Sequence, residues 1–212
     1  MHAAINGATE AEFLARSPLE NEPGTKYDYS NYGAGLLGHA LAKAAGAKSF
    51  EEALVQRVCG PLALKDTRVR LSAEHAARLA PGFNKKGKPA EHWRFALLES
   101  CGGLFSTAGD QVQFIAANLG VTESLLLAAM KDSQRMRRDA DEPGRRVGLC
   151  WHTIPLSAGS KRSIVWHNGG TGAARCFLGF VPDAKIGVVI LTNFERSVDG
   201  PAIELLQKLV AE

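Results

Sequence analysis

The chain has 212 residues, of which 45% are hydrophobic and 22% charged, and its formal net charge is 25 − 22 = +3. This composition is typical of a folded globular protein and excludes a disordered chain. The length predicts one domain or two small lobes. Apolar runs such as 186–191 are far shorter than the roughly 18 residues of a membrane span, so none is expected. The mild charge argues against a nucleic-acid partner, which usually meets a strongly basic face.

Helix signals dominate the first 144 residues. Five segments carry capping or terminating residues at their ends: 9–16, 31–45, 49–58, 107–119 and 122–130. Ser49 and Thr107 are expected N-caps, and Gly46 and Gly120 are expected to end helices. Proline and glycine make residues 80–92 an expected irregular connection.

Strand signals dominate residues 145–212. Four segments rich in β-branched and aromatic residues are expected strands: 147–154, 163–166, 175–181 and 185–192. Pro182 and Asp183 predict a tight turn that joins the last two strands into an antiparallel hairpin. Pro201 is expected at the first position of a final helix to about residue 210. The predicted fold class is therefore α+β: one domain over 1–212, with a helical region and an antiparallel meander covered by the C-terminal helix.

The cysteines and histidines indicate no metal site. Four cysteines (Cys59, Cys101, Cys150 and Cys176) include no CxxC pair, and they are expected to be free thiols, although their even number permits two disulfides. The six histidines include no HExxH pattern. The first seven residues lack the basic and apolar regions of a secretion signal. The cellular compartment stays open.

One glycine motif is misleading. Gly33, Gly35 and Gly38 match GxGxxG, which binds dinucleotides when it follows a buried strand and opens a helix. Here polar and aromatic residues precede the glycines, and the glycines lie inside an expected helix. We expect them to permit close helix packing, and no nucleotide cofactor is predicted.

Two short segments carry possible chemistry. Tyr29 and Asn31 stand just before a helix, and a tyrosine whose pKa is lowered by cations can act as a general base. His167 ends a strand and is followed by glycines, which let a ligand approach the backbone and its N–H donors. A packed tyrosine and a satisfied core histidine are the alternatives.

Several segments, in this order, resemble the motifs of one family: Tyr29-Ser30-Asn31 and residues 61–67, 102–110, 148–151, 167–170, 177–180 and 190–193. They resemble Tyr-x-Asn, Pro-Leu-Gly-Met-x-Asp-Thr, the Gly-Gly stretch before Ser-Thr-Ala-x-Asp, Gly-Leu-Gly-Trp, the His-x-Gly form of Lys-Thr-Gly, and a closing hairpin. The family is that of the class C β-lactamases, which includes related penicillin-binding proteins, esterases and D-amino-acid peptidases.

The resemblance implies a β-lactamase/transpeptidase-like fold and an acyl-enzyme mechanism on a β-lactam, ester or peptide substrate. Tyr29 would carry the proton, Asn31 would bind the substrate amide, and His167 would shape the strand and its charge. Gly169, Gly170 and Thr171 would bind substrate, with the Gly170 N–H as an oxyanion donor. From the cysteine, histidine and glycine patterns above, no cofactor and no metal are predicted.

The nucleophile motif of that family is missing from the sequence. Among twelve serines, none has a lysine three residues later, and no GxSxG is present. The chain is therefore expected to be the C-terminal part of the family's domain, without the nucleophile segment. Its last strand would then present an open edge, covered by a second copy or by an N-terminal fragment. The alternative is a non-catalytic remnant that acts as a ligand-binding or assembly module.

Overall fold

The computed structural model describes residues 15, 18–140 and 142–211, so the helix expected over 9–16 lies outside the described residues except for Ala15. A six-stranded antiparallel sheet has the strand order β3-β4-β5-β6-β7-β8. Its strands are β3 Arg138–Asp139, β4 Arg146–Val147, β5 His152–Pro155, β6 Ser163–Gly170, β7 Arg175–Val181 and β8 Ile186–Thr192. Each pairs with its neighbours, which confirms the predicted meander.

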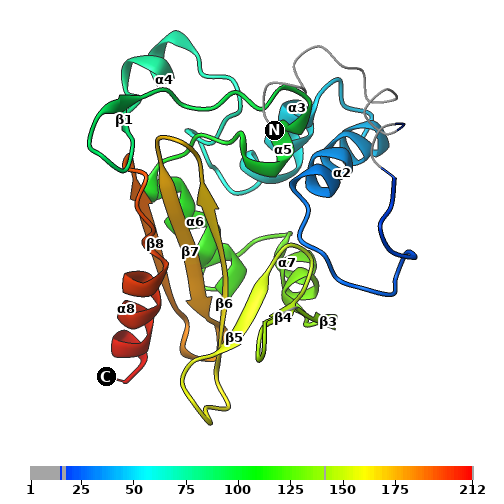
Figure 1. Ribbon diagram of the computed structural model, residues 1–212, viewed down its shortest axis with the longest axis vertical. Helices are drawn as coiled ribbons and strands as arrows, with labels where there is room; N and C mark the ends of the chain where they lie inside the picture. The colour runs from blue at the N-terminus through cyan, green and yellow to red at the C-terminus, as the bar shows by residue number, and fades with distance from the viewer. Residues whose placement is uncertain (1–14, 16–17, 141, 212) are drawn as a thin grey trace.

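The sheet is covered on both faces (Figure 1). Helix α8 (Asp199–Ala211) packs its Leu206 against Phe177 on one face. Helix α6 (Ala108–Leu119) packs its Ile115 against Phe180 on the other. Side chains alternate between the two faces of a strand, so β7 supplies both cores. This arrangement confirms the α+β prediction, including the covering C-terminal helix.

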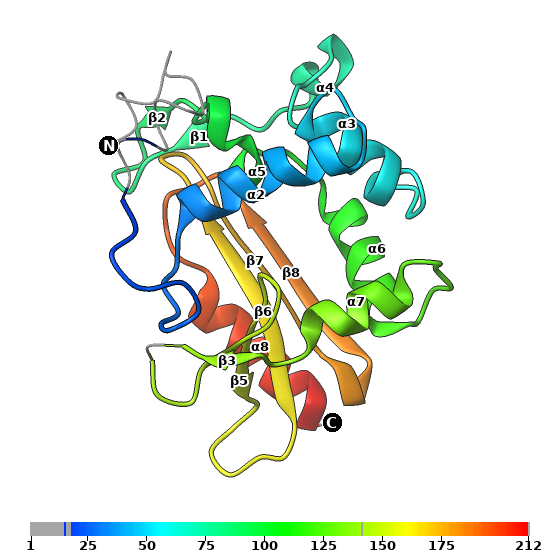
Figure 2. The same ribbon diagram turned by 90° about the vertical axis from the view of Figure 1, so that its right-hand side faces the viewer.

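The helical region lies beyond one end of the sheet and along one face (Figure 2). Its elements are α2 Asn31–Ala44, α3 Phe50–Leu54, the π-helix η2 Val55–Cys59, α4 Ala73–Ala77, the 3₁₀ turn η3 Ala96–Leu98, α5 Glu99–Gly102 and α7 Leu127–Gln134. A third core, around Cys59, Leu62 and Met130, joins this region to α6.

The structure confirms the helix ends predicted from the capping residues Ser49, Thr107 and Gly120. Ser49 Oγ accepts from the Glu52 N–H at 3.1 Å, and Thr107 Oγ1 accepts from the Asp110 N–H at 3.2 Å. Gly120 ends α6 in the left-handed conformation, with φ of 69°. These caps satisfy backbone groups that a helix end leaves unpaired.

Several boundaries differ from the predictions. The single strand expected at 147–154 is two strands, because Cys150 adopts a φ of 61° and the chain reverses between β4 and β5. Residues 80–92 contain a small hairpin of β1 Gly82–Phe83 and β2 Pro89–Ala90. The helix expected from 122 begins at Leu127, and Pro201 is the third residue of α8 rather than the first.

Two of the three glycines of the GxGxxG motif, Gly35 and Gly38, permit close helix packing as predicted, whereas Gly33 meets only Ser30. A Cβ on Gly35 would lie 2.4 Å from Leu98, and one on Gly38 would lie 2.2 Å from Ser100. Ser100 Oγ donates to the carbonyl oxygens of Ala34 and Gly35, at 3.0 Å each. The small residues thus let α2 approach η3 and α5 closely.

Candidate active site

Three aromatic rings meet at the sheet end nearest α2. The Tyr29 ring stacks 6.1 Å from the His167 ring and 6.3 Å from the His152 ring. The two imidazoles stack 5.2 Å apart at an angle of 22°. The loop before α2 therefore places Tyr29, from the first sequence motif, directly on His167, from the second.

His152 is the member of this stack that the sequence reasoning missed. It is buried, with 7% of its surface exposed, and its ring also lies 5.2 Å from that of Trp166. Burial, with the nearby His167 and Arg145, lowers the pKa of His152 to about 4, so the ring is neutral at physiological pH. The one available signal was its position directly after the Gly-Leu-Cys-Trp segment.

The strand segment that carries the predicted substrate residues has one free edge. β5 pairs with β6 only as far as the pair His152–Trp166, whereas β7 pairs with β6 through Gly170. Among the described residues, no strand pairs with 167–170 on the β5 side. A ligand can therefore approach this backbone from the side on which Tyr29 lies.

The Gly170 N–H points toward that free edge. The Thr171 N–H donates to the Ala174 carbonyl oxygen at 3.0 Å, so 171 and 174 form a hydrogen-bonded pair. Hydrogen-bonded and non-hydrogen-bonded pairs alternate along antiparallel strands, so Gly170–Arg175 is a non-hydrogen-bonded pair. The Gly170 N–H is thus directed away from β7, as an oxyanion donor would require.

A side-chain contact with α8 shows which face of the sheet each residue of this strand lies on. Asn168 Nδ2 donates to Asp199 Oδ2 of α8 at 2.8 Å, so Asn168 faces α8. His167 and Gly169 alternate with it and face the helical region. On that face the Cys176 sulfur fills the space beside Gly169, only 2.7 Å from where a Cβ would lie.

Arg175 supports the end of the strand from the other face. Its guanidinium lies over Gly170, donates to the Thr171 carbonyl oxygen and pairs with Glu195 at 3.3 Å. Thr171, the last predicted substrate residue, is therefore held by both its N–H and its carbonyl. Trp93, which is 40% exposed, lies against Gly172 just beyond.

Tyr29 lies in a neutral rather than a cationic environment. Partial burial raises the pKa of Tyr29 above its ordinary value, and the thiols of Cys101 and Cys150 raise it further. No lysine or arginine of the described residues opposes these effects. The described residues therefore keep the phenol protonated at neutral pH, and a general base at this position needs a cation from elsewhere.

Asn31 stands close in sequence but makes no side-chain hydrogen bond within the described part of the chain. It is the first residue of α2 and is exposed. The cap comes from Ser30, whose Oγ accepts from the Gly33 N–H at 3.0 Å. The Asn31 amide is therefore available to a ligand.

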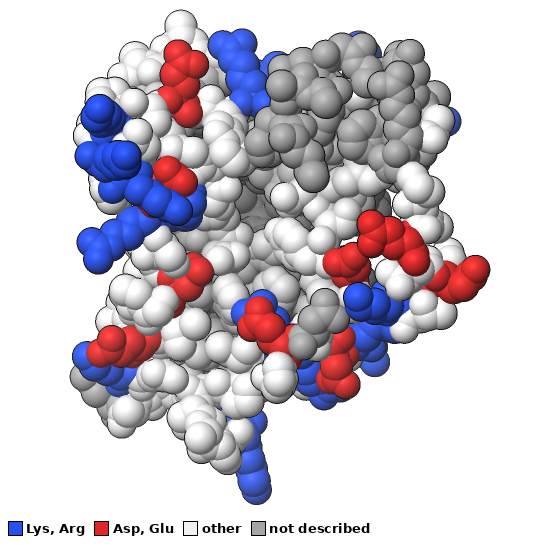
Figure 3. Space-filling model, viewed as in Figure 1, with Lys and Arg blue, Asp and Glu red and all other residues white. Residues whose placement is uncertain are grey.

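Within the part of the chain that the structure describes, metal and membrane features add no site to this one. Within 15, 18–140 and 142–211, no group of three or more His, Cys, Asp or Glu side chains could hold a metal ion. No helix in that part of the chain is long and apolar enough to cross a membrane. On the face in Figure 3, basic and acidic side chains lie in small groups on a mostly uncharged surface.

Comparisons with known proteins give the family and the fold of this chain. The profile of the family described as "Beta-lactamase" matches residues 3–212. The chain is 24% identical to the "D-alanyl-D-alanine-carboxypeptidase/endopeptidase AmpH" of Escherichia coli K12, over 89% of this chain and 52% of that protein. It is 33% identical to "Putative beta-lactamase-like 1" of Homo sapiens, over 80% of this chain and 34% of that protein. The chain spans about half the length of AmpH and of the "Beta-lactamase" of Pseudomonas fluorescens.

Solved structures show the same fold. A class C β-lactamase superimposes with a TM-score of 0.85 at 21% identity, over 98% of this chain and 64% of the other. A "Beta-Lactamase/D-Alanine Carboxypeptidase from Pseudomonas syringae" gives a TM-score of 0.84 at 21% identity, over 97% and 66%. The fold prediction of a partial β-lactamase/transpeptidase-like domain is thereby confirmed.

Proposed function

Because this chain belongs to the β-lactamase family, we propose that it forms one side of an acyl-transfer site for a β-lactam, ester or D-amino-acid peptide. The observation that carries the proposal is the stack of Tyr29 on His167, beside the free edge of residues 167–170. In this proposal a substrate lying along that edge would meet the phenol and the Gly170 N–H, and the exposed amide of Asn31 would bind the substrate amide.

In this proposal the serine nucleophile comes from outside these 212 residues. The sequence holds no Ser-x-x-Lys, and the described surroundings of Tyr29 raise rather than lower its pKa. A nucleophile segment that carries a lysine would supply both missing groups, since an ammonium beside Tyr29 favours the phenolate. Acylation would form a bond from the serine oxygen to the substrate carbonyl carbon, and water would later release the acyl group. An in-frame Ser-x-x-Lys in the DNA preceding the Met1 codon would support this arrangement.

The second candidate function is a ligand-binding or assembly module without catalysis. It is favoured by the missing Ser-x-x-Lys motif and by the raised pKa of Tyr29. A site without a nucleophile and with a protonated tyrosine can still bind a carbonyl compound. The two candidates differ in turnover and in covalent adducts, but not in where the ligand lies.

The test uses the full chain with nitrocefin, p-nitrophenyl butyrate and a fluorescent penicillin. We expect saturable penicillin binding that Tyr29→Phe weakens, and a roughly 100-fold loss in Tyr29→Phe of any turnover that is present, as for a positioned general base. Tyr27→Phe, in the same loop, is the matched control. Binding without turnover favours the module, and no binding by wild type contradicts both candidates.

A further inference from the structure

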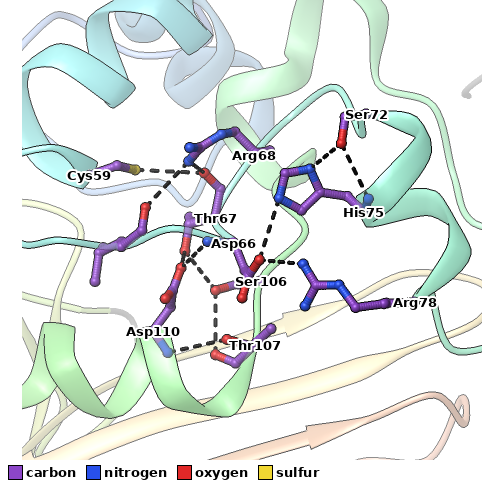
Figure 4. Close-up of polar contacts among 11 residues, drawn as sticks. Cys59, Asp66, Thr67, Arg68, Ser72, His75, Arg78, Ser106, Thr107 and Asp110 are labelled. Carbon is purple, nitrogen blue, oxygen red and sulfur yellow. Dashed lines mark hydrogen bonds and ion pairs between the residues drawn. The ribbon is translucent and has the colours of Figure 1, made fainter.

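A second group of reactive side chains lies away from the Tyr29 site, around the turn that precedes α4 (Figure 4). Ser72 Oγ lies 2.7 Å from His75 Nδ1, and His75 Nε2 lies 3.4 Å from Asp66 Oδ1. The three side chains form a continuous Ser–His–Asp chain of contacts. None of them is used by the proposed acyl-transfer site.

The backbone around the aspartate at the end of this chain is held in place by Asp110, and its carboxylate by Arg78. The Asp66 N–H donates to Asp110 Oδ2 at 2.8 Å, and Thr67 Oγ1 donates to the same oxygen at 2.7 Å. The Arg78 guanidinium is hydrogen-bonded to Asp66 and, with His75, lowers the pKa of that carboxyl. Asp66 is therefore ionised at neutral pH, and its Oδ1 contacts both the Arg78 guanidinium and the imidazole of His75.

This geometry sets the proton positions on His75. An ionised Asp66 favours the tautomer with the proton on Nε2, which leaves Nδ1 as the acceptor for the Ser72 hydroxyl. A serine, a histidine and an aspartate in the same order activate the nucleophile in serine hydrolases, although there Nε2 faces the serine and Nδ1 faces the aspartate. Ser72 is exposed, so its oxygen is accessible to a reagent from solvent.

Helix capping explains only part of the contact between Ser72 and His75. Ser72 is the N-cap of α4, and its Oγ accepts from the His75 N–H at 3.2 Å. That cap needs only a backbone N–H at position 75. It requires neither an imidazole nitrogen on the hydroxyl nor a carboxylate from another segment behind the ring.

We propose that Ser72 is a nucleophilic serine, activated by His75 and Asp66, that is acylated by small activated acyl esters. Ser72 Oγ attacks the acyl carbon while its proton passes to His75 Nδ1. The Oγ–C bond forms, the bond from that carbon to the leaving oxygen breaks, and the leaving group departs as its anion. His75 then releases the proton to water. The product is an O-acyl serine, and no further reagent is needed.

The experiment treats the full chain with p-nitrophenyl acetate and locates acetyl groups by peptide mass spectrometry before and after hydroxylamine. Hydroxylamine removes acetyl esters of serine and leaves acetyl amides of lysine. We expect Ser72 to be the one serine that carries a hydroxylamine-sensitive acetyl group, and about 100-fold slower acetylation of Ser72 in His75→Gln, as for loss of a positioned general base. Ser157→Ala, at an exposed loop serine, should react like wild type.

Ser72→Asn separates nucleophilicity from folding, since asparagine also caps helices but carries no hydroxyl. It should keep the wild-type circular dichroism and lose the adduct. Tyr29→Phe should leave the Ser72 adduct unchanged, so failure of the acyl-transfer proposal would not affect this result. Acetylation spread over other serines at similar rates, or a rate unchanged in His75→Gln, would overturn the inference.

Discussion

At the scale of single residues, the buried imidazole of His152 has a strongly lowered pKa. Its ring lies among Trp166, His167 and Tyr29, and its Nδ1 has no hydrogen-bond partner within the described residues. A charge in this place is disfavoured by lost hydration and by neighbouring Arg145. The neutral ring therefore fits both the fold and the flat contact with Tyr29.

The low pKa of His152 predicts a pH-dependent stability. The native ring takes up a proton only near pH 4, whereas the unfolded ring does so near its ordinary value of 6.5. The unfolded state therefore binds more protons between these values, and stability falls as the pH is lowered from 6.5 toward 4. We expect His152 to contribute a loss of about 2 kcal/mol in unfolding free energy between pH 7 and pH 5.

Urea unfolding of wild type and His152→Gln at both pH values measures this contribution. The variant removes the titrating group, so its stability should change less between pH 7 and pH 5. His167, whose pKa burial also lowers, is present in both proteins, so the difference between them reports the removal of His152. Equal pH dependence in the two proteins would contradict the prediction.

At the scale of elements, the contact of α2 with α5 depends on residues without side chains. Gly38 lies directly against Ser100, and the Ser100 hydroxyl is bonded to two carbonyl oxygens of α2. This contact positions the start of α2, and with it the loop that holds Tyr29. A change in helix spacing should therefore disturb the site as well as the core.

Gly38→Ala should lower the unfolding free energy by about 1–3 kcal/mol, because the added methyl group would overlap Ser100 in a packed contact. Gly33→Ala is the matched control on the same helix, since its Cβ would meet only Ser30, at 3.5 Å. There alanine should stabilise the helix by about 0.5–1 kcal/mol. Denaturant melts of both variants give the two signs, and equal effects would show that the close contact is unimportant.

At the scale of the whole molecule, the sheet ends at β8. Among the described residues, no strand pairs with the outer edge of β8. Its seven residues include neither a charged side chain nor a proline, the usual features that protect an edge strand from pairing with other chains. We propose that a second copy of the chain or a separate fragment of the domain covers this edge.

A charge on the edge tests this proposal. Leu191 is 41% exposed on β8, and Leu191→Lys should weaken self-association about tenfold because a lysine there opposes strand pairing. Leu125→Lys, at a fully exposed loop leucine, is the matched control. Light scattering at micromolar concentration reports the assembly, and a monodisperse wild-type monomer would contradict self-pairing.

The sequence alone determined the features that rest on local chemistry. Ser49, Thr107 and Gly120 set helix ends because capping needs only neighbouring residues, and β-branched and aromatic content placed β7 and β8. The family followed from short motifs whose order is visible in one dimension. The reversal at Cys150 was not visible, because a residue other than glycine rarely adopts a positive φ unless tertiary contacts impose it.

Only the tertiary structure decided which groups meet. His152 joined Tyr29 and His167 because β5 begins beside β6 at that point, a register that no sequence pattern states. The same holds for Asp66 and His75, which a turn and a short helix bring together. The charge around Tyr29 is also a tertiary property, since it depends on side chains distant in sequence. Local order was therefore determined by the sequence, whereas the chemistry of both sites depends on long-range contacts.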